Sequence, residues 1–263
     1  MVEYWYRYRD DLWKKVTIWE AKHEAGYHPR KPDAKEKSLA NIRRAARTIE
    51  GYALCNEWQW FGTFTLNPAC RDRTDLDGFR KDFMQYVRNT RRTCPAFQAL
   101  LVPELHRNKE GWHMHGLIQG LPVEMLRLFT LSEKLPKYIR QKLKAGQLLY
   151  DWPGYRERFG WVDIEAIRSR DAAARYITKY ITKGKDETAQ VLDLGKHLYY
   201  ATRGLSKPER MEVENAPGTF GAVPDAFPSG LVEGNSYPFE YGFVTWYECP
   251  YPRLHQERIA SQA

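Results

Sequence analysis

Two strand-like segments separated by a very short connection constrain the fold of this chain more than any other feature. Residues 97–105 and 111–118 are rich in apolar and β-branched residues, as buried strands are. Residues 107–110, which join them, match the length of a hairpin loop and are too few for a crossover. The sequence therefore predicts an antiparallel hairpin.

The second strand of this hairpin carries the sequence His113-Met114-His115, which places two imidazoles on one face. A two-residue turn sets Glu104 opposite His113, and a shift by two residues sets it opposite His115, so both registers bring the carboxylate to the histidine face. His106 shares that face and is a competing ligand. Two imidazoles and a carboxylate leave open positions on a divalent cation such as Mn²⁺, which tolerates nitrogen better than Mg²⁺, and Zn²⁺ is also compatible. The alternative is a pair of polar residues on a half-exposed strand.

Periodicity and turn residues predict further elements on both sides of the hairpin. Strands are expected at 58–66 and 161–167, and helices within 1–28 and 33–52, at 76–92, within 123–148 and at 172–183. Ser169 or Asp171 is the expected cap of the last helix. This order of elements is compatible with an α+β fold.

Charge is distributed unevenly along the 263 residues. Residues 1–210 hold 39 basic and 26 acidic side chains, a net charge of +13, whereas residues 211–263 are acidic and rich in Pro and Gly. A basic chain with many Trp and Tyr side chains is typical of proteins that bind a phosphate backbone and stack bases, although a merely basic soluble protein would look similar. Arg43, Arg44 and Arg47 are candidate phosphate contacts, with a solvated helix face as the alternative.

The predicted helix at 172–183 contains Tyr-Ile-Thr-Lys twice. At about 100° per residue, Tyr176, Lys179, Tyr180 and Lys183 share an arc of about 100°, and the two isoleucines face elsewhere. A phenol titrates near pH 10, so nucleophilic attack at neutral pH requires a nearby cation, which lysine supplies. An ordinary amphipathic helix with tyrosine on its wet side is the alternative.

In chain order, three segments resemble motifs of the HUH superfamily of rolling-circle replication initiators. Phe61-Gly62-Thr63-Phe64-Thr65 is similar to the first motif, His113-Met114-His115 to the histidine motif, and the doubled tyrosine segment to the paired-tyrosine initiators of small phages. The likeness covers about residues 58–208. Related relaxases supply a third histidine, which Glu104 would replace here. Beside the metal ligands and the Tyr-Lys pairs, we assign DNA contacts to Thr63, Thr65 and Arg175.

The resemblance implies a central antiparallel sheet of about five strands with flanking helices and the tyrosine helix over a metal, Mn²⁺ or Mg²⁺. It implies that a tyrosine attacks single-stranded or hairpin origin DNA, giving a 5′-phosphotyrosyl link and a free 3′-hydroxyl, and that the second tyrosine acts in rejoining. If a single tyrosine acts, Tyr176 is favoured. The sequence lacks a P-loop motif, so a host helicase, a polymerase and a single-strand-binding protein are the expected partners. The expected domains are a helical basic region (1–56), the nuclease (57–210) and an irregular acidic extension packed on it, with one strand near 239–247 (211–263).

Three other functions compete with this one. They are a transposase or relaxase with the same chemistry, an origin-binding regulator without catalysis, and an unrelated metal-dependent hydrolase. The first residues lack a basic-then-apolar leader, and no window approaches the roughly 18 to 20 apolar residues of a membrane span. We therefore expect no membrane partner and a cytoplasmic location, that of the host cell if a phage encodes the protein.

Overall fold

The computed structural model describes residues 2–18, 31, 33–106, 111–183, 197–211, 223–239 and 242–248. Their contacts divide the chain into two compact units, one of Pro32–Leu205 and one of Met1–Lys31 with Ser206–Ala263. These limits differ from the expected division at residues 56 and 210. In the described part of the chain, no helix combines the length and the hydrophobicity needed to cross a bilayer.

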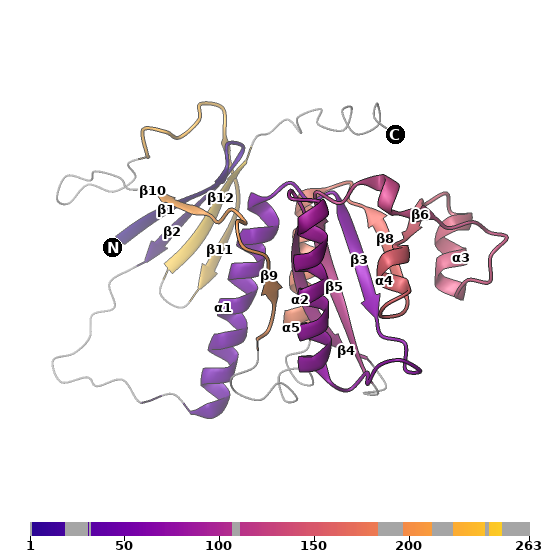
Figure 1. Ribbon diagram of the computed structural model, residues 1–263. Coiled ribbons are helices and arrows are strands. Elements are labelled where there is room, and N and C mark those ends of the chain that lie inside the picture. The colour runs from indigo at the N-terminus through magenta and orange to yellow at the C-terminus, as the bar shows by residue number, and fades with distance from the viewer. Residues whose placement is uncertain are drawn as a thin grey trace. The chain divides into compact units, whose positions relative to one another are not determined.

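The larger unit is built on a seven-stranded sheet in the order β6-β7-β8-β3-β5-β4-β9 (Figure 1). Its strands are β3 (Trp60–Thr65), β4 (Gln98–Leu105), β5 (Trp112–Gln119), β6 (Arg127–Leu128), β7 (Leu149–Asp151), β8 (Val162–Ala166) and β9 (Tyr200–Ala201). Neighbouring strands are antiparallel. The α+β class is confirmed, and the sheet exceeds the expected five strands because short strands extend its edges.

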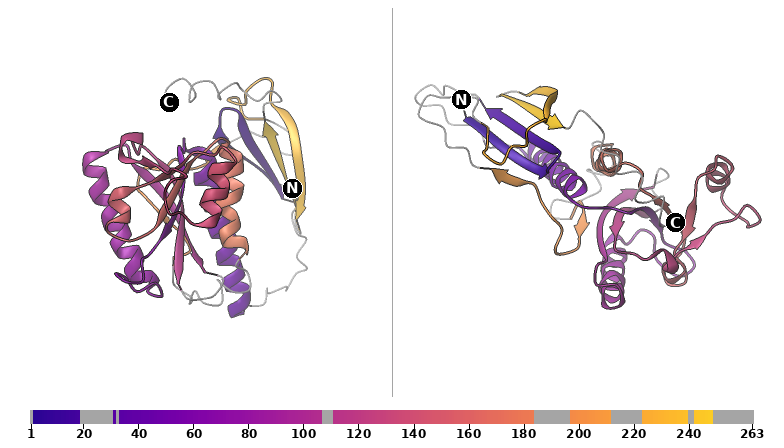
Figure 2. Two further views of the ribbon diagram at one scale, coloured as in Figure 1. Left: turned by 90° about the vertical axis from the view of Figure 1, so that its right-hand side faces the viewer. Right: turned by 90° about the horizontal axis from the view of Figure 1, so that it is seen from above.

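Helices cover both faces of this sheet, as the left view of Figure 2 shows. They are α1 (Ala34–Cys55), α2 (Leu76–Thr93), α3 (Lys137–Lys144), α4 (Pro153–Arg156) and α5 (Arg170–Lys183), with a 3-10 turn at Val123–Met125. Phe64 points to the α2 face, where its ring packs on Phe83 and Tyr155. Because side chains alternate along a strand, Phe61, Thr63 and Thr65 point to the opposite face, which α5 covers.

Local sequence signals explain where α1 and α5 begin. Asp33 and Glu36 form a capping box at the start of α1, each side chain accepting from the other's backbone N–H. The Ser169 hydroxyl accepts from the Ala172 N–H, which confirms the predicted cap of α5. The predicted strands at 58–66, 97–105, 111–118 and 161–167 and the helix at 76–92 agree with the structure to within about two residues.

The smaller unit is a five-stranded sheet in the order β10-β1-β2-β12-β11. Its strands are β1 (Val2–Arg9), β2 (Leu12–Ile18), β10 (Glu209–Met211), β11 (Val232–Phe239) and β12 (Gly242–Glu248). The prediction of helix within residues 1–28 is therefore wrong over the described residues 2–18. Trp5 and Trp13 are spaced as on a helix, yet both are buried on one face of the sheet against Phe227.

Two other predictions differ from the structure. Within 123–148, the expected helices reduce to one 3-10 turn and α3, because Pro136 precedes α3 and Gly146, with a φ of +78°, follows it. The extension 211–263, expected to be irregular with one strand, contributes two paired strands, β11 and β12. Pro238 is accommodated because β11 lies at the sheet edge. The expected break at 28–32 lies, apart from Lys31, outside the described residues.

Candidate active site

The two histidines of β5 share one face of the sheet, and the hairpin register is one of the two predicted. Glu104 on β4 is the direct partner of His113. Its carboxylate nevertheless turns diagonally to His115, with 2.8 Å between Glu104 Oε2 and His115 Nε2. His115 is 6% exposed, so this contact lies at the base of the site.

Two threonines of β3 contact the other ring nitrogens of these histidines. Thr65 is paired with His113, and 2.7 Å separates Thr65 Oγ1 from His113 Nδ1. Thr63 is paired with His115 at a longer distance of 3.4 Å between Oγ1 and Nδ1. Both residues were assigned to DNA contacts from the sequence. In the structure their hydroxyls lie against the imidazoles, where they fix the orientation of each ring.

Burial lowers the pKa of His113 to about 4, and the neighbouring His106, His115 and Arg73 act in the same direction. The rings of His106 and His113 lie 5.0 Å apart. His113 is therefore neutral at pH 7, the form in which imidazole binds a metal.

In the described part of the chain, no three or more His, Cys, Asp or Glu side chains are arranged to hold a metal ion. Glu104 and His115 instead use their donor atoms on one another. The donor types of Glu104, His113 and His115 suit a divalent cation, and the first two lie close enough to face a common ion. The residues thus fit such an ion chemically, provided that Glu104 and His115 exchange their mutual hydrogen bond for it.

The tyrosine helix α5 lies over the histidine face. The ring of Tyr180 stacks on His115, with centroids 3.7 Å apart and planes 9° apart. Ile177 and Ile181 are buried, as the helical periodicity predicts. Tyr176 is 47% exposed and meets Tyr180 edge to face at 5.2 Å.

Tyr180 is held in its neutral form in this arrangement. Burial raises its pKa well above the usual range, and a hydrogen bond with Tyr176 and the charges of Glu104 and Asp163 raise it further. Attack by this phenol therefore requires a cation beside it to stabilise the phenolate.

Residues 59–185 match the model of a family described as replication-associated protein ORF2. The matched segment runs from the start of β3 past the end of α5, so it contains the histidines, Glu104 and both tyrosines. The match supports a replication-initiator family, a role in DNA replication and DNA binding. No curated protein and no solved structure matches the chain.

The basic residues assigned to catalysis or DNA lie on α1 and α5, two helices that pack against each other. Exposed side chains among them belong to Arg43, Arg44, Arg47, Arg175 and Lys179. Lys183 lies at the end of α5, and its side chain is outside the described residues.

Sequence reasoning missed Asp163, a buried carboxylate on the histidine face. Asp163 on β8 is the direct partner of Thr63, and it accepts hydrogen bonds from the Tyr138 hydroxyl at 2.8 Å and Trp161 Nε1 at 3.3 Å. Burial raises its pKa, and these hydrogen bonds and Lys142 oppose that shift. The alternation within 161–167 places Asp163 on one face of a strand, but the neighbouring strand is known only from the fold.

Proposed function

We propose that this protein is a rolling-circle replication initiator that nicks and rejoins single-stranded origin DNA through a tyrosine. The observation that carries the proposal is the stack of Tyr180 on His115, with Glu104 bonded to the same imidazole and Tyr176 against the phenol. A phenol, a carboxylate and neutral imidazoles at one place suit phosphoryl transfer to tyrosine.

In the proposed reaction, a tyrosine Oη forms a bond to the scissile phosphorus and the bond from phosphorus to the 3′-oxygen breaks. The phenol proton leaves to solvent, and the departing 3′-oxygen takes up a proton. Rejoining is the reverse transfer, in which a 3′-hydroxyl displaces the tyrosine and restores the phosphodiester.

A divalent cation, Mn²⁺ or Mg²⁺, held by Glu104, His113 and His115 would supply positive charge at the scissile phosphate. Thr65 and Thr63 hold the imidazoles in place through Nδ1. This leaves Nε2 of His113 facing away from β3.

The two tyrosines have different environments, which supports different roles. Tyr180 touches His115 and is half-buried, so we propose it as the phenol nearest the scissile phosphate in the DNA-free protein. This choice differs from the preference for Tyr176 based on sequence alone. Tyr176, which is more exposed and contacts Phe61 edge to face at 5.1 Å, is proposed to take the second transfer. Lys179 lies between them in the helix and is proposed to stabilise the phenolate.

An origin-binding regulator without catalysis is the second candidate. The observation that favours it is the closed hydrogen bond between Glu104 and His115, which engages two of the three proposed ligands. Cleavage separates the two functions, since a regulator binds DNA and leaves it intact.

The experiment uses a pool of randomised single-stranded oligonucleotides with labelled 5′ and 3′ ends, incubated with the full chain and Mn²⁺. We expect a denaturant-stable protein adduct that carries the 3′ label, together with a released 5′-labelled fragment. The double variant Tyr176→Phe/Tyr180→Phe should form none. A matched control is Tyr86→Phe/Tyr150→Phe, because both of these tyrosines pack in the core on the α2 face. Intact oligonucleotides with the wild-type protein would overturn the proposal.

A further inference from the structure

Helix α3 lies on the histidine face of the sheet, towards the edge opposite to α5. Its Tyr138 hydroxyl donates to Asp163, and its Lys142 pairs with Glu165, both on β8. Asp163 neighbours Thr63, which in turn neighbours His115. Helix α5 contacts β4 and β5, so the two helices stand over opposite sides of this face.

The exposed side of α3 is positively charged. The sequence Lys137–Lys144 has four basic residues and no acidic one. Lys137, Arg140 and Lys144 are exposed and form no ion pair within the described part of the chain. A cluster of unpaired cations on one helix face attracts a phosphate backbone.

Tyr138 adds an aromatic surface to this positive side. Its ring is 46% exposed, while its hydroxyl is held by Asp163 and lies 3.2 Å from Trp161 Nε1. A ring fixed by its hydroxyl loses little further freedom when a base stacks on it. An exposed aromatic ring beside cations is the combination with which proteins bind single-stranded nucleic acid.

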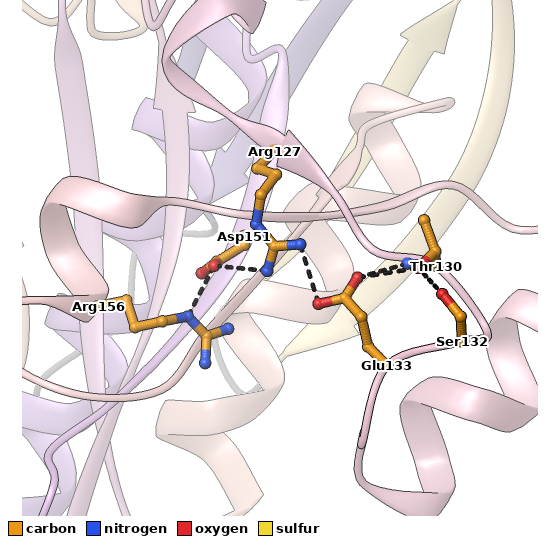
Figure 3. A network of polar contacts seen from close by, with 6 residues as sticks. All are labelled: Arg127, Thr130, Ser132, Glu133, Asp151 and Arg156. Atoms are coloured by element: carbon orange, nitrogen blue, oxygen red, sulfur yellow. Dashed lines mark hydrogen bonds and ion pairs between the residues drawn. The ribbon is translucent and has the colours of Figure 1, made fainter.

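A polar network holds the segment that carries α3 (Figure 3). Asp151, which is 1% exposed, accepts from Arg127 at 3.1 Å and from Arg156 at 2.7 Å. Arg127 also donates to Glu133, which accepts from the Thr130 N–H at 2.8 Å. The network joins β6, the turn before α3, β7 and α4, so α3 is presented on a rigid support.

Apolar packing beneath the helix completes this support. Ile139 is fully buried in a cluster with Phe129 and Leu149, and Leu143 packs against the same cluster. The buried side of α3 is thus apolar, which leaves its cationic side facing outward.

We propose that the exposed face of α3 binds the part of the single strand next to the scissile phosphate. Tyr138 stacks on a base, and Lys137, Arg140 and Lys144 contact phosphates. Asp163 and His115 lie two strands apart, about 10 Å, so the stacked base lies about three nucleotides from the phosphate at the histidines. This inference rests on the proposed function and adds a subsite that positions the substrate.

The test measures binding of a fluorescent 30-nucleotide mixed-sequence single strand to the full chain at several NaCl concentrations. Lys137→Gln/Arg140→Gln/Lys144→Gln should weaken binding at low salt and lower the slope of log K against log salt by about 2, since each lost phosphate contact removes about 0.7. The matched control is Lys81→Gln/Arg88→Gln/Arg92→Gln on α2, which covers the other face and should leave affinity unchanged apart from a small general charge effect.

The stacking role has its own pair of variants. Tyr138→Ala should weaken binding about 5- to 150-fold, as loss of one stacked base does. Tyr138→Phe keeps the ring and should bind within about threefold of the wild type. Equal losses in both variants would show that the hydroxyl, rather than the ring, is required.

The outcomes separate this inference from the proposed function. Wild-type nicking together with unchanged binding in the α3 triple variant, or an equal loss in the α2 control, overturns the inference alone. Binding that depends on α3 without any nicking overturns the proposed tyrosine chemistry and retains the DNA surface. A wild-type protein that binds no single strand overturns both.

Discussion

Replacing Thr65 by valine tests how the histidines are positioned. Valine keeps the branched shape and removes the hydroxyl that lies 2.7 Å from His113 Nδ1. The lost hydrogen bond costs about 0.5 to 1.5 kcal/mol of ring orientation. Partners of this kind change metal affinity or activity by about 10- to 100-fold when removed, equivalent to about 1.4 to 2.7 kcal/mol. We expect the Mn²⁺ concentration for half-maximal nicking to rise by that factor.

The structure also ranks the matched variants. Thr63 Oγ1 lies 3.4 Å from His115 Nδ1, beyond the normal range, so Thr63→Val should cost less than about threefold. Thr65→Ser retains the hydroxyl and should restore most of the activity. Melting temperature should fall by no more than about 4 °C, because one hydrogen bond is lost from a large unit.

The assay is Mn²⁺ titration of oligonucleotide nicking, combined with NMR of the His113 ring nitrogens, which reports the tautomer without relying on activity. A Thr65→Val protein with wild-type Mn²⁺ dependence and an unchanged tautomer would refute the positioning role. A larger effect of Thr63→Val than of Thr65→Val would refute the ranking by distance.

Three further predictions concern the tyrosines, a buried carboxylate and the core. Tyr180→Phe should reduce nicking more than Tyr176→Phe, each single variant should retain some adduct, and repeated transfer should suffer in both; the reverse order on a denaturing gel would restore the preference for Tyr176. Burial raises the pKa of Asp163, so the folded state holds this proton more tightly than the unfolded chain, and stability falls as pH rises from the ordinary aspartate range through the raised pKa. Asp163→Asn should abolish that fall and raise the urea midpoint at pH 7, and a lower midpoint with an unchanged pH dependence would contradict this. Phe83, 1% exposed and stacked near Phe64, should cost about 3 to 5 kcal/mol when changed to alanine, measured by urea unfolding, and a loss below about 1 kcal/mol would contradict its place in the core.

Sequence reasoning succeeded where the determining interactions are local. The hairpin of β4 and β5 follows from its short connection, and the pairing of Glu104 with His113 follows from a two-residue turn. The buried side of α5 follows from helical periodicity, because Ile177 and Ile181 repeat at a spacing of four. These features need no information from distant parts of the chain.

Pairing between distant segments explains the failures. β2 lies between β1 and β12, and β12 is more than 220 residues further along the chain, so nothing near Trp13 indicates that its partner is a strand. The contact of Thr65 with His113 depends on β3 lying beside β5, which the sequence does not reveal. Asp163 escaped notice for the same reason, since β8 neighbours β3 only in the folded sheet.

Mapping the covalent link between protein and DNA tests the central claim most directly. Trypsin cannot assign it, because cleavage after Arg175, Lys179 and Lys183 yields two identical Tyr-Ile-Thr-Lys peptides. Cleavage before aspartate releases residues 171–185 as one peptide that holds both tyrosines, and its fragmentation distinguishes them. The account predicts a nucleotide attached through phosphate to Tyr180 or Tyr176. A link at any other residue, or no link from a protein that cleaves DNA, would contradict it.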